Sequence, residues 1–510
     1  MDNENNEERR RHNDDNELPP NIFDLNNELP PLIYTGRILA MPSECSTNPL
    51  QRALADSIIK MVSLDELRIL LACGAKVNDP VTQGLCALHY AVWQKNVAAI
   101  NLLLVRGADI NKIDDCGYSA LHLAAEHGYY EICKLLLDAG AKIDYREPTD
   151  EIFPRTTLCD EPLRLALRNK HYDVARLLCE RGADVNKRYF FGAEINLAAD
   201  LESLELLLNF GANTEIRDRQ GLTPLMRYAR QSSGMEAVLL LLKYGADVNA
   251  MADGRNDFRT VLHYAILSGV EYSIHGNIKL VQLLIKQGAK VDLLPPQPEP
   301  DRASPLDLAI LRGDPALVRL LLENKANVNR CSQIIGSPLH VACADKILHR
   351  VEIMKMLLSY GADPNVRIYG EMGSNAILRP PLAELLSSND NVTLEEVKLL
   401  LKHGARVIMK TQFRDPDGIL NCLTNLTSDS IVFKHLVESA EEFDPCMTRR
   451  TQHLTIKQRS MIMEKATNPL SLQAIVRAFF RRLFGKKLPE KVPQLEMPKM
   501  LYKYLLYETY

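Results

Sequence analysis

Residues 119–144 read SALHLAAEHGYYEICKLLLDAGAKID, and copies of this pattern recur along most of the chain. The first half has a small or Pro-containing opening followed by Leu and often His. The second half is an amphipathic helix that ends in Gly-Ala. Gly suits the end of such a helix because the chain must turn there through a left-handed conformation. The stretch therefore predicts two helices joined by tight turns as the repeating unit.

The pattern runs from residue 48 to about 408 in ten clear copies, and an eroded eleventh copy lies at 418–438. Strong steps of 33 or 34 residues separate neighbouring copies. A fixed period of this length predicts a solenoid in which each unit packs on its neighbours. One slot has Lys325 in place of the glycine. The glycines of the other slots are Gly74, Gly107, Gly140, Gly182, Gly211, Gly245, Gly288, Gly361 and Gly404. At Gly107 we predict a positive φ that a β-branched residue would not tolerate.

The period and openings such as TPLMRYARQ (from 223) and SPLHVACAD (from 337) resemble the ankyrin repeat family. In these openings Thr or Ser caps the first helix, and Pro suits the first turn because its missing N–H has no partner there. The resemblance implies an all-α ankyrin-repeat solenoid over residues 48–445, which would bind an unidentified protein target.

Three intervals between repeats are longer than the period, at 42, 43 and 43 residues. The surplus lies at 145–160, 251–277 and 366–380, with a smaller extension at 293–303. Insertions in a solenoid fall in loops on one face, which is often the binding face. Neutral drift of exposed loops is the alternative, and both readings stay open.

The last forty residues begin with apolar residues from Leu472 to Phe484 at the spacing of one helical face. Ser471 is the expected N-cap and Gly485 the expected stop, and a second short helix is predicted at roughly 499–507. Two or three short helices cannot bury this much Leu, Phe and Tyr among themselves. The segment is therefore predicted to pack on something else.

This segment, residues 469–510, resembles a SOCS box. Leu472, Val476 and Phe480 occupy the positions where the family has Leu, usually Cys, and an aliphatic residue. In the second half the family has Leu-Pro-apolar-Pro, and this chain has Leu495-Glu496-Met497-Pro498, so the first proline is lost. The resemblance implies binding of Elongin B and Elongin C by the first half and of a cullin, usually Cullin-5, by the second. The expected Elongin-binding residues are Leu472, Ile475, Val476, Phe479 and Phe480. The expected cullin-binding residues are Leu495, Met497, Pro498, Leu501 and Tyr504.

The two resemblances together indicate the ankyrin repeat and SOCS box family. They imply a substrate-recognition adaptor of an Elongin–cullin RING ubiquitin ligase, which marks its target for proteasomal degradation and has no catalytic residues of its own. The alternative is a non-catalytic ankyrin scaffold whose degenerate box caps the solenoid. A cap would turn Leu472, Val476 and Phe479 inward, whereas a recruitment box would leave them exposed.

Residues 1–30 hold nine Asp or Glu and eight Asn, so residues 1–47 are predicted to be a disordered tail and a lead-in. Residues 446–468, with a basic run, are predicted to be a solvated linker. Arg477, Arg481 and Arg482 are interpreted as the polar side of an amphipathic helix.

The remaining sequence argues against other functions. The net charge of −4 gives no reason to expect nucleic acid, and no stretch is apolar enough to span a membrane. Eleven scattered cysteines indicate a reducing compartment, so we expect a cytoplasmic protein that could also enter the nucleus. No catalytic, cofactor or metal motif is present. The recurrent His89, His122, His263 and His340 are expected to form hydrogen bonds within turns.

Overall fold

The computed structural model describes residues 49–145, 160–189, 192–268, 278–293, 302–369 and 376–508. The predicted tail and lead-in lie outside the described residues, as do parts of all four insertions. The described residues form two compact units, which divide after Lys142.

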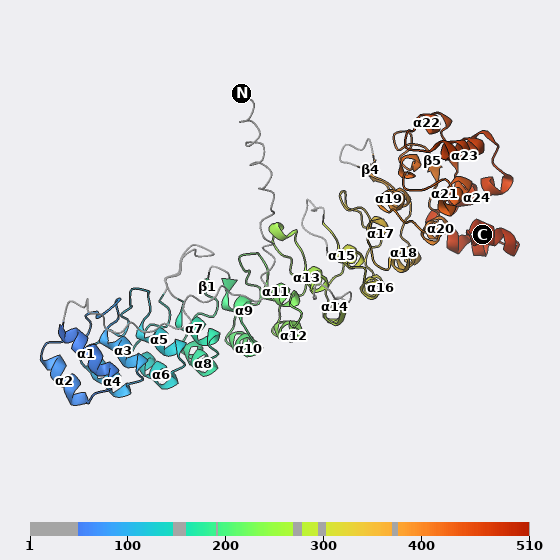
Figure 1. Ribbon diagram of the computed structural model, residues 1–510. Helices are drawn as coiled ribbons and strands as arrows, with labels where there is room; N and C mark the ends of the chain where they lie inside the picture. Colours follow the sequence, from blue (N-terminus) through green and yellow to red (C-terminus); the bar gives the residue numbers. More distant parts are fainter. Residues whose placement is uncertain are drawn as a thin grey trace, which may run out of the picture. The chain divides into compact units, whose positions relative to one another are not determined.

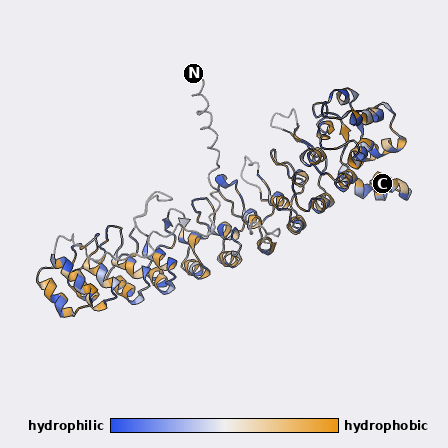
Figure 2. Cartoon of the chain, in the orientation of Figure 1, coloured by the Kyte–Doolittle hydropathy of each residue, from blue (hydrophilic) through white to orange (hydrophobic). Residues whose placement is uncertain are grey.

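The first unit contains three helix pairs within residues 49–142. Each pair buries the apolar side of both helices, and Figure 2 shows hydrophobic and hydrophilic residues alternating around them. The helices are α1 (Pro49–Ile59), α2 (Leu64–Ala72), α3 (Ala87–Trp93), α4 (Val97–Val105), α5 (Ala120–Glu126) and α6 (Tyr130–Asp138).

The second unit continues with seven helix pairs in its described residues. Its first helices (α9, α11, α13, α15, α17) form one row and its second helices another (Figure 1). The pairs are α7 (Pro162–Arg168) and α8 (Tyr172–Glu180), α9 (Glu194–Leu197) and α10 (Leu201–Asn209), α11 (Pro224–Ala229) and α12 (Met235–Lys243), α13 (Val261–Leu267) and α14 (Ile278–Lys286), α15 (Pro305–Leu311) and α16 (Pro315–Glu323), α17 (Pro338–Cys343) and α18 (Arg350–Ser359), and α19 (Pro381–Ser388) and α20 (Leu394–Lys402). The predicted all-α solenoid is confirmed.

The second unit also contains short strands and a 3₁₀ turn. Two antiparallel hairpins and one 3₁₀ turn lie between helix pairs, and the 3₁₀ turn and the second hairpin fall within inserted segments. They are β1 (Arg188–Tyr189), β2 (Gly192–Ala193), η1 (Gly254–Asn256), β3 (Ile368–Tyr369) and β4 (Ala376–Leu378).

The recurrent histidines cap the first helices and also join neighbouring repeats. The backbone N–H of Cys86 donates to Nδ1 of His89 at 3.1 Å, so the ring proton lies on Nε2. That Nε2 lies 3.1 Å from the carbonyl oxygen of Tyr118 in the next repeat. The same contact from the N-cap backbone to Nδ1 occurs at His122, His263 and His340. The prediction that these histidines form hydrogen bonds within turns is confirmed.

Asparagine side chains form a second set of bridges between repeats. Asn365 donates from Nδ2 to the carbonyl oxygen of Gly404 at 2.8 Å and accepts at Oδ1 from the N–H of Arg406 at 2.9 Å. These contacts satisfy backbone groups that a turn leaves without intrahelical partners. Equivalent bridges begin at Asn78, Asn186, Asn249 and Asn329. Neutral hydrogen bonds thus join one repeat to the next.

The turn after each second helix has the predicted left-handed backbone. Gly107 has a φ of +83°, which confirms the reason for expecting damage from Gly107→Val. In the slot without glycine, Lys325 adopts a φ of +64°. The solenoid therefore imposes the same turn even where the residue disfavours it.

The solenoid ends in a shortened eleventh repeat. Its first helix is reduced to the 3₁₀ turn η2 (Leu420–Cys422), and its second is α21 (Ile431–Ser439). Ile408 stands four residues after Gly404, where other repeats have the bridging asparagine. There β5 (Ile408–Met409) pairs in parallel with β6 (Glu442–Phe443), so a short strand pairing replaces the asparagine bridge.

The prediction of a solvated linker at 446–468 is wrong. The segment forms α22 (Pro445–Arg450) and α23 (Ile456–Thr467), and α23 begins with a capping box. Leu454, Gln458 and Ile462 are buried at four-residue spacing. Gln458 donates from Nε2 to the carbonyl oxygen of Leu426 at 2.6 Å. The four-residue spacing of Leu454, Gln458 and Ile462 in the sequence indicates one helical face, but the basic residues around it favoured the interpretation as a linker.

Candidate functional site

The C-terminal module is built around its longest helix. Ser471 caps α24 by accepting from the N–H of Ala474 at 3.2 Å, and the helix ends at Gly485, which has a φ of +49°. Both predicted ends of the first helix are confirmed, and the second predicted helix is present as α26. The elements are α24 (Leu472–Phe484), η3 (Gly485–Lys487), α25 (Leu488–Lys491), η4 (Val492–Gln494) and α26 (Lys499–Leu505).

One face of α24 packs inside the module. Val476, Phe480 and Phe484 lie four residues apart and contact the module's small core. The rings of Phe480 and Phe484 stack with their centres 5.6 Å apart. The core consists of Leu488, Val492, Leu505 and Leu506. This face therefore holds the two halves of the module together.

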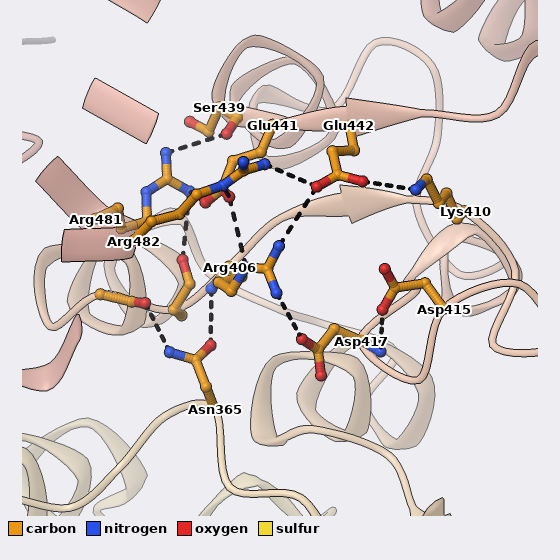
Figure 3. A network of polar contacts seen from close by, with 12 residues as sticks. Asn365, Arg406, Lys410, Asp415, Asp417, Ser439, Glu441, Glu442, Arg481 and Arg482 are labelled. Carbon is orange, nitrogen blue, oxygen red and sulfur yellow. Dashed lines mark hydrogen bonds and ion pairs between the residues drawn. The ribbon is translucent and has the colours of Figure 1, made fainter. Parts of the chain in front are cut away.

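A second face of α24 carries arginines, and it is buried. Arg477 and Arg481 are only 7% and 2% exposed. Arg481 donates to the carbonyl oxygens of Ala405 at 3.3 Å and Ser439 at 3.1 Å, and its guanidinium lies 3.3 Å from a carboxylate oxygen of Glu441 (Figure 3). These two arginines do form the polar side of the helix, as interpreted from the sequence. The correction is that this side is buried, and that Arg481 packs on the end of the solenoid because buried acceptors there match its guanidinium group.

Glu441 and Glu442 anchor the contact from the solenoid side. The side chain of Glu441 is fully buried, and it also accepts from Nε of Arg482 at 3.0 Å. Glu442 lies 2.7 Å from Arg482 and 2.6 Å from Lys410, and the hydrogen bond from Lys410 is the main cause that lowers the pKa of its carboxyl group. Arg406 lies within 3.5 Å of both glutamates (Figure 3). Several charges of each sign thus meet where the module joins the last repeats.

Aromatic and backbone contacts complete this joint. The guanidinium carbon of Arg477 lies 3.4 Å from the ring centre of Tyr504 and 4.5 Å from that of Tyr507, within the range of cation–π attraction. At Gly404, a β-carbon would lie 2.3 Å from the carbonyl oxygen of Gly485. The backbones of the solenoid and the module therefore approach too closely for a side chain at Gly404.

The third face of α24 is apolar and exposed. The side chains of Leu472, Ile475, Phe479 and Leu483 are 76%, 50%, 58% and 59% exposed. Their spacing of three or four residues places them in one stripe along the helix. We call these four residues the outer stripe. A helix that buries arginines and exposes Leu, Ile and Phe has the surface expected of a helix awaiting an apolar partner.

The residues predicted for Elongin binding divide between two faces. Leu472, Ile475 and Phe479 belong to the outer stripe, whereas Val476 and Phe480 pack on the module's own core. The structure adds Leu483, which was recognised as apolar but was not included among the contacts. Its position, four residues after Phe479, was the signal that could have placed it there.

The residues predicted for cullin binding are also unequal in exposure. Pro498 and Leu501 are exposed, whereas Met497 packs on the core and Tyr504 lies against Arg477. Leu495 is half-buried. Met500, 79% exposed and next to Leu501, was missed because it falls outside the pattern of the resemblance.

No group of three or more His, Cys, Asp or Glu side chains in the described parts of the chain is placed to hold a metal ion. Burial is the main cause that raises the pKa of Cys86 to about 11 and that of Cys179 to about 12. Both thiols are therefore protonated at neutral pH, unlike a thiol that carries out covalent transfer.

Helices of the described segments are all too short or too polar to cross a lipid bilayer.

Comparison with known families supports both parts of this architecture. The family model of ankyrin repeats matches residues 58–147, 88–189, 195–294 and 271–368, which together cover more than half of the chain. The SOCS box model matches residues 468–506. The solenoid thus defines an ankyrin repeat protein. With its C-terminal module, the chain belongs to the ankyrin repeat and SOCS box family.

Individual relatives carry the same name. The chain is 30% identical over 160 residues to ankyrin repeat and SOCS box protein 6 of Homo sapiens, covering 31% of this chain and 35% of that protein. It is 26% identical over 304 residues to ankyrin repeat and SOCS box protein 14 of Mus musculus, covering 57% of this chain and 45% of that one. The chain thus matches about a third to a half of the length of these relatives. A crystal structure of the ankyrin repeat domain of human ASB11 is 23% identical, with a TM-score of 0.36, and covers 48% of this chain and 99% of that domain.

Proposed function

We propose that this chain is a substrate-recognition adaptor of a ubiquitin ligase. Its SOCS box binds Elongin B and Elongin C and recruits a cullin, Cullin-5, with its RING partner. Its ankyrin repeats hold a protein target, which is then ubiquitinated and degraded by the proteasome. The chain itself supplies binding and no catalysis. It acts in the cytoplasm, with the nucleus as a second location.

The observation that carries the proposal is the orientation of α24. The contacts of buried Arg481 fix the helix on the last repeats, and this leaves the outer stripe facing outward. Three of the five residues assigned to Elongin binding lie in that stripe. The geometry therefore supports recruitment of a partner by the same helix that is held by the solenoid.

The alternative, a scaffold with a capping box, requires Leu472, Val476 and Phe479 to face the solenoid. Leu472 and Phe479 are instead 76% and 58% exposed, and Val476 packs within the module. Arg481 and Arg482 do cover part of the last repeats, so capping accounts for one face of α24. The outer stripe has no role in that alternative.

Leu472→Ala tests the recruitment step. Loss of a leucine that becomes buried at an interface costs roughly 2–5 kcal/mol, so affinity for the purified Elongin B–Elongin C pair should fall by more than tenfold in calorimetry. Ile456→Ala is the matched control, because Ile456 is 84% exposed but lies on α23 outside the module. If the unmodified chain does not bind the pair at all, the capping scaffold replaces the adaptor.

Glu496→Pro tests the cullin step. Leu495 has φ −88° and ψ 130°, an extended conformation that suits a residue before proline. Proline would reduce the freedom of the unbound segment, so the complex of the Elongin-bound chain with Cullin-5 should tighten by about 1 kcal/mol. Unchanged or weaker binding would mean that Glu496 makes its own contact or that another cullin is the partner.

A further inference from the structure

One face of repeats six to nine combines an excess of arginine with exposed leucines. The segments that lead into and form the first helices of these repeats, residues 216–231, 251–268, 302–312 and 330–343, hold nine arginines and four aspartates. The second helices of the same repeats, α12, α14, α16 and α18, hold two arginines, Arg319 and Arg350. These four segments contain no lysine or glutamate, so nine arginines against four aspartates leave an excess of five positive charges in a chain whose net charge is −4.

Two of the four aspartates on this face are buried. Asp218 and Asp307 are 2% and 4% exposed, and Asp218 already pairs with Arg227 at 3.4 Å. Arg217 donates instead to the carbonyl oxygens of Gly221 at 2.9 Å and Met251 at 2.7 Å. Neutral carbonyl acceptors hold a guanidinium group in place without cancelling its charge. The face therefore presents a net positive potential to an approaching segment.

Exposed leucines occupy equivalent places in consecutive repeats. Leu267 and Leu311 each stand seven residues after the N-cap of their first helix, and they are 41% and 52% exposed. Arg230 stands at the same position in the preceding repeat and is exposed. Arg312 donates to the carbonyl oxygens of Ile266 at 2.8 Å and Ser268 at 3.3 Å, so the turns that carry the two leucines are fixed side by side.

A third leucine extends the row into the ninth repeat. Leu348 is 53% exposed, and its own β-carbon lies 2.6 Å from where a β-carbon on Gly313 would be, so it sits directly beside the turn after Leu311. Lys346, two residues before it, and His349, directly after it, have positive φ values of 59° and 52°. Such backbone is unfavourable for non-glycine residues. We call Leu267, Leu311 and Leu348 the leucine row.

From this juxtaposition we propose that the leucine row and the arginines around it bind an acidic protein segment with apolar residues about 10 Å apart. Neighbouring helices of packed pairs lie roughly 8–10 Å apart, and a polyproline II segment, which has three residues per turn, advances about 9 Å in three residues. Every third side chain of the segment can therefore reach a leucine. The residues between them supply carboxylates for the arginine-rich face, beginning at Arg230.

This inference deepens the proposed function, because the segment would belong to the protein that the adaptor recognises. A nucleic acid would also be attracted by the arginines, but it offers no match for three leucines. The row therefore favours a protein segment over a polyanion.

A direct test uses a fluorescein-labelled peptide of sequence DELDELDELDEL and the full chain in an anisotropy titration. We expect binding that weakens as salt rises and that is lost when each Leu of the peptide becomes Ser. The double variant Leu267→Ser, Leu311→Ser should weaken binding by at least about tenfold, since apolar area is no longer buried. Arg230→Glu should weaken it in the same direction.

Matched controls lie on the second helix of the sixth repeat. Leu239 is 43% exposed on α12, and Leu239→Ser and Lys243→Glu should leave peptide binding unchanged. No binding of the peptide, equal binding of its Ser version, or equal binding of a labelled single-stranded oligonucleotide would overturn the proposal. Elongin affinity of the leucine-row variants should stay unchanged, so failure here is distinguishable from failure of the adaptor function.

Discussion

The solenoid has two kinds of joint, and they rely on different interactions. Between repeats, neutral bridges such as those of Asn365 and His89 link backbone groups and recur along the solenoid. Between the last repeats and the SOCS box, the central contact is the buried pair of Arg481 and Glu441. Loss of a neutral bridge at one repeat lowers folding stability only by the contribution of its hydrogen bonds. Loss of one partner of a buried charge pair leaves the other charge without compensation.

This difference matters for an adaptor. Bridges between repeats shape the surface that holds a target, and variation in one of them is a local change. The charged joint occurs once and sets the direction in which the outer stripe faces. We therefore expect changes at the joint to affect docking of the whole module.

The largest effect should follow Glu441→Ala. Removing the carboxylate leaves Arg481 buried beside carbonyl oxygens alone, and such a change typically costs about 3–5 kcal/mol. Hydrogen exchange should show α24 opening at much lower free energy than in the unmodified chain. The control is Glu395→Ala, since Glu395 belongs to an exposed pair with Lys355 and should cost less than about 1 kcal/mol. Equal losses in the two variants would remove the distinction between the joints.

Gly404→Ala should have the next largest effect. Gly404 and Gly288 have nearly equal φ values of +90° and +92°, so alanine strains both turns by about 1–2 kcal/mol. Only at Gly404 would the new β-carbon meet the module, 2.3 Å from the carbonyl oxygen of Gly485, whereas nothing lies within 4 Å of the one at Gly288. Gly404→Ala should therefore lower the urea midpoint more than Gly288→Ala does. If both variants shift the urea midpoint equally, the module accommodates the β-carbon at Gly404 without a loss of stability.

Mild acid should lower the stability of the folded chain at His435, which lies beside the charged joint. Burial, followed by Lys398, Arg477 and Arg481, lowers the pKa of His435 to about 4 from its ordinary 6.5. Between these pH values the unfolded chain binds a proton that the folded chain does not, so folding stability contributed by His435 is present above 6.5 and is lost as pH falls toward 4.

Denaturant midpoints at pH 7 and pH 5 measure this effect. His435→Gln should reduce the difference between the two midpoints, whereas His453→Gln, at an exposed histidine, should not. A difference that is unchanged in His435→Gln would assign the acid sensitivity to other groups.

The smallest effect should be an increase in the free energy of unfolding after a substitution in a turn between two repeats. Lys325 adopts a φ of +64° in the slot that other repeats fill with glycine, so Lys325→Gly should relieve strain and raise the free energy of unfolding by about 1 kcal/mol. Lys243→Gly, at the last residue of helix α12, should lower it by less than about 1 kcal/mol. If both variants lower the free energy of unfolding, the contacts of Lys325 stabilise the fold by more than its backbone strain destabilises it.

Much of the fold was predictable because its determinants are local. The glycine of each slot and the histidine three residues after an N-cap act within a few residues of themselves, and the period of the repeats then follows. The segment at 446–468 was misjudged because its basic residues outweighed the four-residue spacing of Leu454, Gln458 and Ile462. The outer stripe was only partly predicted, since one helix has two apolar faces and the sequence does not say which face is covered.

The sequence by itself determined the repeating helices, their caps and turns, and the resemblance of the last forty residues to a SOCS box. All of these depend on backbone preferences and on residues close together in the chain. Only the tertiary structure decided that Arg477 and Arg481 point into the protein while Leu472 and Phe479 point out. The physical reason is that Glu441 and the carbonyl oxygens of Ala405 and Ser439, up to 76 residues away in sequence, provide the acceptors that make burial of a guanidinium group favourable.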